Sequence, residues 1–221
     1  MNFQQAFANF PSFFKRNEPQ EEQPPEPEKK EETIFGMDIH LIPVNDNGCP
    51  IFLPIVIDEI IKNAEVQGLF RICGNHRIVQ ELGHAALNPV NFVPPAECRI
   101  HEYTSFLKQW LRSLPEPILT NDVVNNYYNK EDPKSVSEML LYLDPLNRRC
   151  VALIFKALRA ILSKSSINMM TFQNLDICFN LSFLQTDSKF QYKDDFEFEP
   201  FYTVLVQKLN KEGNDFVFDC V

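Results

Sequence analysis

The chain has 221 residues, of which 44% are hydrophobic and 23% charged, and its formal net charge is −9 at pH 7. This length suits one domain with a full hydrophobic core and an appended segment. The negative charge argues against nucleic acid as a partner, and no apolar run approaches the roughly 20 residues that a membrane-spanning helix needs.

Residues 1–17 carry an aromatic repeat. On a helix, one stripe would hold Phe3, Phe7, Phe10 and Phe14. Such a segment suits an amphipathic hook for a partner's groove or a membrane surface. A protein groove is favoured over a membrane because the segment's cations are limited to Lys15 and Arg16. Packing onto the folded domain and an unstructured end are the alternatives.

Residues 18–33 are predicted to be a linker. They contain seven glutamates, two lysines and four prolines, and no apolar anchor. Such a composition buries too little surface to offset the entropy of ordering it. Its prolines and like charges favour an extended spacer, so the N-terminal extension is predicted to be flexible or disordered.

The folded domain is predicted to begin near Ile34, with a first helical region within 50–66. That region opens at Pro54 and has apolar residues at helical spacing, namely Ile57, Ile60, Ile61 and Ala64. Gly68 is well placed to end the helix in a left-handed cap.

Arg71 lies between Gly68 and Gly74 on a short loop that is held by a helix at each end. Asn75 is the predicted N-cap of the second helix, whose buried stripe would be Ile78, Val79, Leu82 and Ala86. A purely structural role is the alternative, in which Phe70 and Ile72 anchor this loop in the core and Arg71 simply points to water.

The segment 101–117 predicts a helix with one buried side, formed by Tyr103, Phe106, Leu107, Trp110, Leu111 and Leu114. Lys108 and Arg112 project together from the opposite side. Because like charges one turn apart repel slightly, an anionic or hydrogen-bonding partner explains them better than helix stability does. An ordinary solvated face is the alternative. Pro115 and Pro117 end the helix.

The remaining chain is also predicted to be helical. Short helices are expected at 123–128 and 134–143. Asp144-Pro145 opens a longer one with Val151, Ile154, Ala157, Leu158, Ile161 and Leu162 buried. Thr171 caps the next helix, and Pro200 starts a last one. Strand alternation is scarce, which predicts a mostly helical single domain.

No catalytic set or metal site is predicted. The six cysteines show no Cys-x-x-Cys pair and no secretion signal precedes them, so they are expected to be intracellular thiols. His40, His76 and His84 lack metal-ligand spacing, and His101 has no second histidine one helical turn later. The glycines form no phosphate-cradling loop.

Three segments resemble the Rho GTPase-activating protein (RhoGAP) domain family. They are Gly68-Leu69-Phe70-Arg71-Ile72-Cys73-Gly74, then Lys108 to Pro117 (KQWLRSLPEP), then Asn168-Met169-Met170-Thr171 with Asn174-Leu175. Each is weak alone, but their order and intervals together are specific. The resemblance covers about residues 34–210. It implies an all-α helical bundle, with 34–221 as the RhoGAP-like domain after the 1–17 segment and the 18–33 linker.

The resemblance implies a protein that activates a Rho, Rac or Cdc42-type GTPase in its GTP-bound state, in cytoskeletal signalling, and that is not itself an enzyme. Arg71 would be an arginine finger directed at the β- and γ-phosphates. Lys108, Arg112 and Asn174 would bind the GTPase, and the loop would be supported by Gly68, Phe70, Gly74, Pro115 and Pro117. No cofactor of its own is expected, because GTP and magnesium belong to the partner. The expected location is the cytoplasm, with recruitment to a membrane through the GTPase left open.

Two positions depart from the family pattern. Asn180-Leu181 stands where a Gly-Pro turn is usual, which should alter how that helix ends, and Cys73 replaces a serine or proline beside the finger. The rival hypotheses are a non-catalytic adaptor that binds the GTPase with the same surface, and an adaptor whose N-terminal Phe stripe recruits a partner or membrane. The particular GTPase is not predicted.

Overall fold

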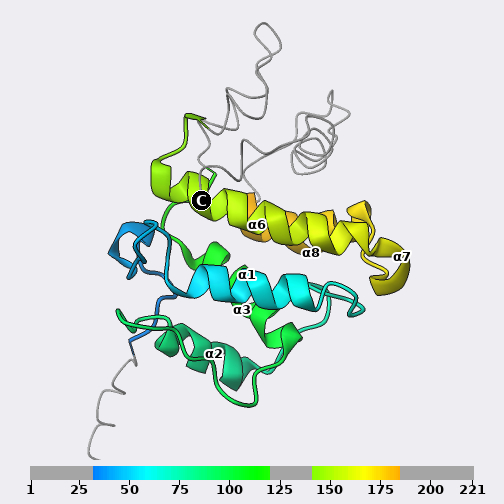
Figure 1. Ribbon diagram of the computed structural model, residues 1–221, viewed down its shortest axis with the longest axis horizontal. Coiled ribbons are helices and arrows are strands. Elements are labelled where there is room, and N and C mark those ends of the chain that lie inside the picture. The colour runs from blue at the N-terminus through cyan, green and yellow to red at the C-terminus, as the bar shows by residue number, and fades with distance from the viewer. Residues whose placement is uncertain (1–31, 120–140, 185–221) are drawn as a thin grey trace, which may run out of the picture. The chain divides into compact units, whose positions relative to one another are not determined.

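The computed structural model describes residues 32–119 and 141–184, and within these ranges the chain is helical (Figure 1). The elements are a 3-10 turn η1 (Ile39–Leu41), α1 (Phe52–Lys62), α2 (His76–Ala85), α3 (Ile100–Ser113), α6 (Pro145–Ser163), α7 (Ser165–Asn168) and α8 (Phe172–Leu184). The β structure of the described ranges is limited to an isolated antiparallel bridge between Val44 and Pro50. The predicted all-α bundle is confirmed.

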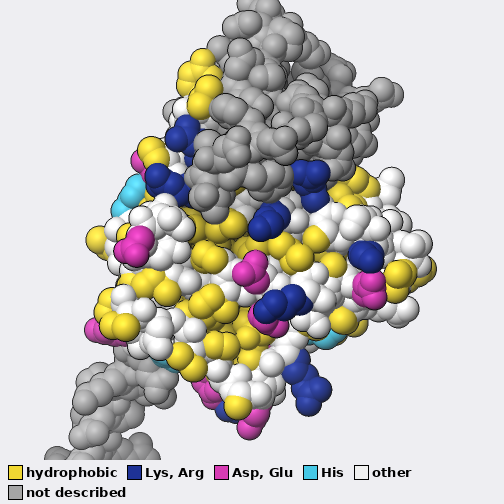
Figure 2. Space-filling model, in the orientation of Figure 1, with side chains coloured by type: hydrophobic (Ala, Val, Ile, Leu, Met, Phe, Trp, Pro, Cys, Tyr) yellow, Lys and Arg dark blue, Asp and Glu magenta, His cyan; other side chains and the backbone are white. Residues whose placement is uncertain are grey.

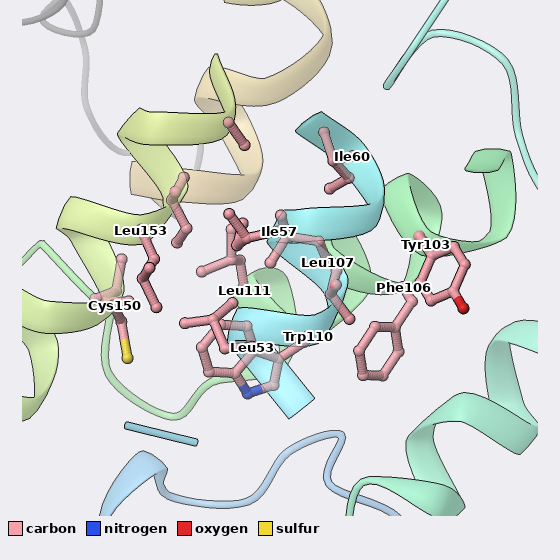
Figure 3. Close-up of a cluster of buried hydrophobic side chains, with 14 of the residues drawn as sticks. Leu53, Ile57, Ile60, Tyr103, Phe106, Leu107, Trp110, Leu111, Cys150 and Leu153 are labelled. Atoms are coloured by element: carbon pink, nitrogen blue, oxygen red, sulfur yellow. The ribbon is translucent and has the colours of Figure 1, made fainter. Parts of the chain in front are cut away.

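The core is built around α3, which packs against α1, α2 and α8, while α1 also lies along α6 (Figure 1). The ring of Phe52 on α1 meets Phe106 and Trp110 of α3 edge-on, with centroid separations of 5.2 and 5.0 Å. Each such aromatic pair adds about 0.5–1.5 kcal/mol beyond its buried area. Figure 3 shows the apolar side chains of α1 and α3 pointing toward one another, with Cys150 and Leu153 of α6 beside them.

The helical stripes predicted from the sequence are buried. All six predicted apolar positions of the 103–114 stripe are buried, and so are the four predicted on α2. Of the six apolar positions predicted on α6, five are buried and Leu162 is partly exposed. Asn75 caps α2 by accepting a hydrogen bond from the Arg77 N–H, Asp144 caps α6, and Thr171 caps α8 through a 3.4 Å bond from the Asn174 N–H. These predictions are confirmed.

The first helix differs from the prediction at both ends. Pro54 lies at the third residue of α1, where its missing N–H would have no helical partner anyway. The helix ends at Lys62, because the Asn63 side chain bonds to the Glu59 carbonyl and its backbone leaves the helical region. Gly68 has the expected left-handed backbone, with φ of +73°, but it lies beyond the helix and does not cap it.

Several predicted segments lie outside the described residues. These are the 1–17 segment, most of the 18–33 linker, the helix at 123–128, nearly all of 134–143, and the helix expected after Pro200. In the ranges that are described, none of the helices combines the length and the apolar character needed to cross a bilayer.

Candidate functional site

Arg71 lies at the exposed tip of a tight turn formed by residues 68–74, which we call the Arg71 loop. The N–H groups of Arg71 and Ile72 both donate to the Gly68 carbonyl, each at 2.9 Å. A Cβ atom at Gly68 would lie 2.8 Å from the Ile72 side chain, on a backbone that already favours glycine. Within the described residues, Arg71 makes no ion pair. The loop therefore presents an uncompensated guanidinium on a short, constrained backbone.

Phe70, directly before Arg71, also has a left-handed backbone, with φ of +64°. This conformation is unfavourable for a bulky residue by about 1–3 kcal/mol and persists only where the surroundings impose it. The Phe70 ring is buried and meets Phe179 of α8 edge-on at 4.9 Å. Ile72, in contrast, is 45% exposed. The alternative prediction that Phe70 and Ile72 both anchor the loop in the core is therefore wrong for Ile72.

Lys108 holds the Arg71 loop from the side of α3. Its Nζ donates to the Phe70 carbonyl at 2.5 Å. Burial, reinforced by the nearby charge of Arg112, lowers the pKa of Lys108 below its usual value. The sequence placed Lys108 and Arg112 together on the outer side of the helix. Arg112 is exposed there, but Lys108 is half-buried and bends onto the loop, where it fixes the peptide that precedes Arg71.

The far end of the loop is bonded to the first turns of α3. The Gly74 N–H donates to Ser105 Oγ at 2.8 Å, and the Asn75 N–H donates to Glu102 Oε1 at 2.9 Å. A Cβ atom at Gly74 would lie 2.6 Å from the Glu102 Cα, so no side chain fits at this position. Ser105 and Glu102 were not among the predicted site residues, because these contacts join positions about 30 residues apart in the chain.

Asn168 is the buried residue that ties the loop to the rest of the bundle. Its Nδ2 donates to the carbonyls of Ala64 and Ile161, and its Oδ1 accepts from the Met170 N–H, all at 2.7 Å. Its own carbonyl accepts from the Gly68 N–H at 3.2 Å. In the sequence, the one signal of its importance was its place in the Asn168-Met169-Met170-Thr171 motif.

Asn174 lies in the first turn of α8, and its Nδ2 donates to the Met169 carbonyl at 2.9 Å. One of its amide protons is therefore used within the chain. Pro115 and Pro117 follow α3 and fix where the helix that carries Lys108 and Arg112 stops. The backbone stays helical through 180 and 181, and α8 ends at Leu184.

The surface has a mixed character. On the face shown in Figure 2, hydrophobic side chains lie among separate Lys and Arg side chains. Across residues 32–119 and 141–184, no three His, Cys, Asp or Glu side chains are grouped so that they could hold a metal ion. Chemically, the described part of the chain offers an exposed arginine on a braced loop.

Comparison with known proteins gives a consistent result. Residues 50–188 match the family model described as the RhoGAP domain. The chain is 26% identical over 167 residues to Rho GTPase-activating protein 12 of Homo sapiens, covering 71% of this chain and 20% of that protein. It is 28% identical over 169 residues to Rho GTPase-activating protein conundrum of Drosophila melanogaster, covering 66% of this chain and 27% of that protein. The chain thus spans between a fifth and about a quarter of the length of these two relatives.

A solved structure shares the fold. The crystal structure of human Rho GTPase activating protein 15 superimposes with a TM-score of 0.65 at 22% sequence identity, covering 83% of this chain and 92% of that one.

Proposed function

Because the chain belongs to the RhoGAP domain family, we propose that it accelerates GTP hydrolysis by a Rho-family GTPase in its GTP-bound state. The observation that carries this proposal is Arg71, exposed and without an ion pair in the described residues, on a loop bonded to α3 on one side and to Asn168 on the other. The chain supplies this arginine in trans and needs no cofactor of its own.

Arginine suits the task for electrostatic reasons. During GTP hydrolysis negative charge builds up on the β- and γ-phosphate oxygens, and a positioned cation lowers the barrier by stabilising it. A guanidinium is always charged and donates to two oxygens at once in a planar geometry. A braced backbone helps, since the side chain is then aimed before the partner arrives.

The other predicted residues have supporting roles in this proposal. Lys108 holds the Phe70 carbonyl and so orients the peptide before the finger. Arg112, exposed one turn further along α3, and Asn174, at the start of α8, contact the GTPase directly. Gly68 and Gly74 allow the loop its turn and its close approach to α3.

Single-turnover GTP hydrolysis by a panel of Rho, Rac and Cdc42-type GTPases tests the proposal. We expect the full chain to accelerate at least one of them by orders of magnitude. The panel also identifies the preferred GTPase. Binding of the GTP form without any acceleration would instead identify the chain as a GTPase-binding adaptor, and the proposal would fail.

We predict that Lys108→Met slows GTPase acceleration about tenfold or more. Methionine preserves the packing of the stem but removes the donor to Phe70, and a hydrogen bond from a charged group contributes about 1.5–3 kcal/mol. The rate is measured in single-turnover hydrolysis at saturating protein. Lys62→Met is the matched control, because Lys62 is exposed on α1 and pairs with Glu59. Equal rates for both variants would mean that the bond does not position the finger.

A further inference from the structure

A cavity of about 420 Å³ lies beside the Arg71 loop, between α2 and α3. Its walls include Cys73 from the loop, His76 and Val79 from α2, and Ser105, Lys108 and Arg112 from α3. Cavities of about 300–1,000 Å³ with an apolar wall and a few polar groups are typical small-molecule sites.

The cavity is positively charged, and the part of the chain that the structure describes supplies no counter-ion to it. Lys108 bonds to a neutral carbonyl, and Arg112 makes no ion pair within the described residues. Among the described residues that line the cavity, none carries a carboxylate. The N-terminal end of α2 also opens onto the cavity at His76 and adds the positive end of a helix dipole. The ligand that complements these groups is an anion.

Cys73 gives the cavity a nucleophile. Its side chain is an exposed free thiol, it lies two residues from Arg71, and it lines the same cavity as Lys108. The buried cysteines Cys49 and Cys150 lack such access. An anionic reagent that is drawn to Lys108 and Arg112 is therefore brought up to a thiol.

We propose that this cavity binds a small peptide disulfide that carries carboxylates, of the glutathione class, and that Cys73 forms a mixed disulfide with it. The carboxylates pair with Lys108 and Arg112, and the apolar wall at Val79 accepts the rest of the bound half. Cys73 Sγ, as the thiolate, attacks one sulfur of the reagent. The bond between the two reagent halves breaks, the bond to Cys73 forms, and the second half leaves as a thiolate that takes up the proton lost by Cys73. No further oxidant is needed.

The consequence rests on the proposed function. A carboxylate-bearing adduct at Cys73 lies beside Arg71 and neutralises Lys108 and Arg112, so it blocks the GTPase-binding surface. The adduct is removed by a reducing thiol. Activity would then depend on the thiol–disulfide balance of the surrounding solution.

The first test needs no GTPase. The reduced full chain is treated with oxidised glutathione and, in parallel, with the neutral disulfide of 2-mercaptoethanol, and the rate at each cysteine is measured by peptide mass spectrometry. At each thiol, the rate with oxidised glutathione is divided by the rate with the neutral disulfide, so that the intrinsic reactivity of the thiol drops out of the ratio. We expect this ratio to be on the order of tenfold higher at Cys73 than at Cys98, to fall with salt, and to drop in Arg112→Gln. Equal ratios at Cys73 and Cys98, or a ratio that Arg112→Gln leaves unchanged, would overturn the proposal.

The second test uses GTP hydrolysis. Modification of the wild type should reduce its acceleration of the GTPase at least tenfold, and a reducing thiol should restore it. Cys73→Ser should keep the acceleration and lose the sensitivity. Selective labelling that leaves the acceleration unchanged would refute the inhibitory role. If the unmodified chain accelerates no GTPase, the proposed function fails, whereas the labelling ratios still decide whether the cavity guides the anion.

Discussion

Replacing Arg71 by alanine is expected to remove most of the GTPase acceleration, a loss of roughly 10³- to 10⁵-fold that corresponds to about 4–7 kcal/mol of barrier. Arg71 is exposed, and within residues 32–119 and 141–184 its hydrogen bond to the protein comes from the backbone N–H, so its side chain is not expected to be needed for folding. Affinity for the GTP-bound partner should change far less than the rate, because in the proposed mechanism the guanidinium acts mainly on charge that develops in the transition state.

The measurement is single-turnover hydrolysis at saturating protein, together with a binding titration against the GTP form. Arg77→Ala is the matched control. It is another exposed arginine, on the first turn of α2, and it pairs with Glu81 and Glu97 instead of standing free. Arg71→Lys should recover little activity, since an ammonium lacks the planar fork. If Arg71→Ala accelerated GTP hydrolysis as well as the wild type does, the proposed finger mechanism would be ruled out.

Replacing Asn168 by alanine is expected to lower the free energy of unfolding by about 3 kcal/mol or more. The substitution leaves the Ala64 carbonyl and the Met170 N–H without the partner that Asn168 supplies in a buried place, and each such group costs about 1–3 kcal/mol. The Ile161 carbonyl loses one of its donors and keeps the Lys164 N–H at 3.1 Å. The same network holds the Gly68 end of the Arg71 loop, so GTPase acceleration should fall as well.

Urea denaturation measures the stability change. Asn63→Ala serves as the control, because its side chain donates to the Glu59 carbonyl at the partly exposed end of α1 and makes no other hydrogen bond within the described ranges. We expect that variant to lose about 1 kcal/mol. Asn168→Asp keeps the acceptor for Met170 but loses both donated bonds, so it should resemble the alanine variant. A loss below that of Asn63→Ala would show that the Asn168 network is not important for stability.

The helices and their buried sides were predictable because helical periodicity is a local signal. The stripe from Tyr103 to Leu114 repeats so regularly that no other element accommodates it, and α3 buries all of it. The caps at Asn75 and Thr171 were also readable, since short polar side chains before an apolar run have few other roles. The left-handed turn at Gly68 was predicted correctly, although the helix before it ends earlier.

The contacts that shape the site were not predictable in the same way. Lys108 reaches Phe70 across 38 positions of the chain, and Asn168 reaches Ala64 across 104. Periodicity assigns Lys108 to the outer side of its helix, but it does not say that the long side chain bends back over the neighbouring loop. The end of α1 at Asn63 escaped prediction because a local side-chain bond there outweighs the apolar pattern, which continues to Ala64.

The left-handed backbone at Phe70 also bears on how fast a complex forms. A loop that becomes ordered only on binding costs about 0.5–1.5 kcal/mol for each side chain it immobilises, and its rearrangement slows association. Here the Phe179 ring and the Lys108 ammonium already hold the peptide before Arg71. The conformational entropy of that backbone is lost when the chain folds, not when the partner arrives. Association with the proposed GTPase partner is then expected to be governed by diffusion and orientation, as in rigid-body docking.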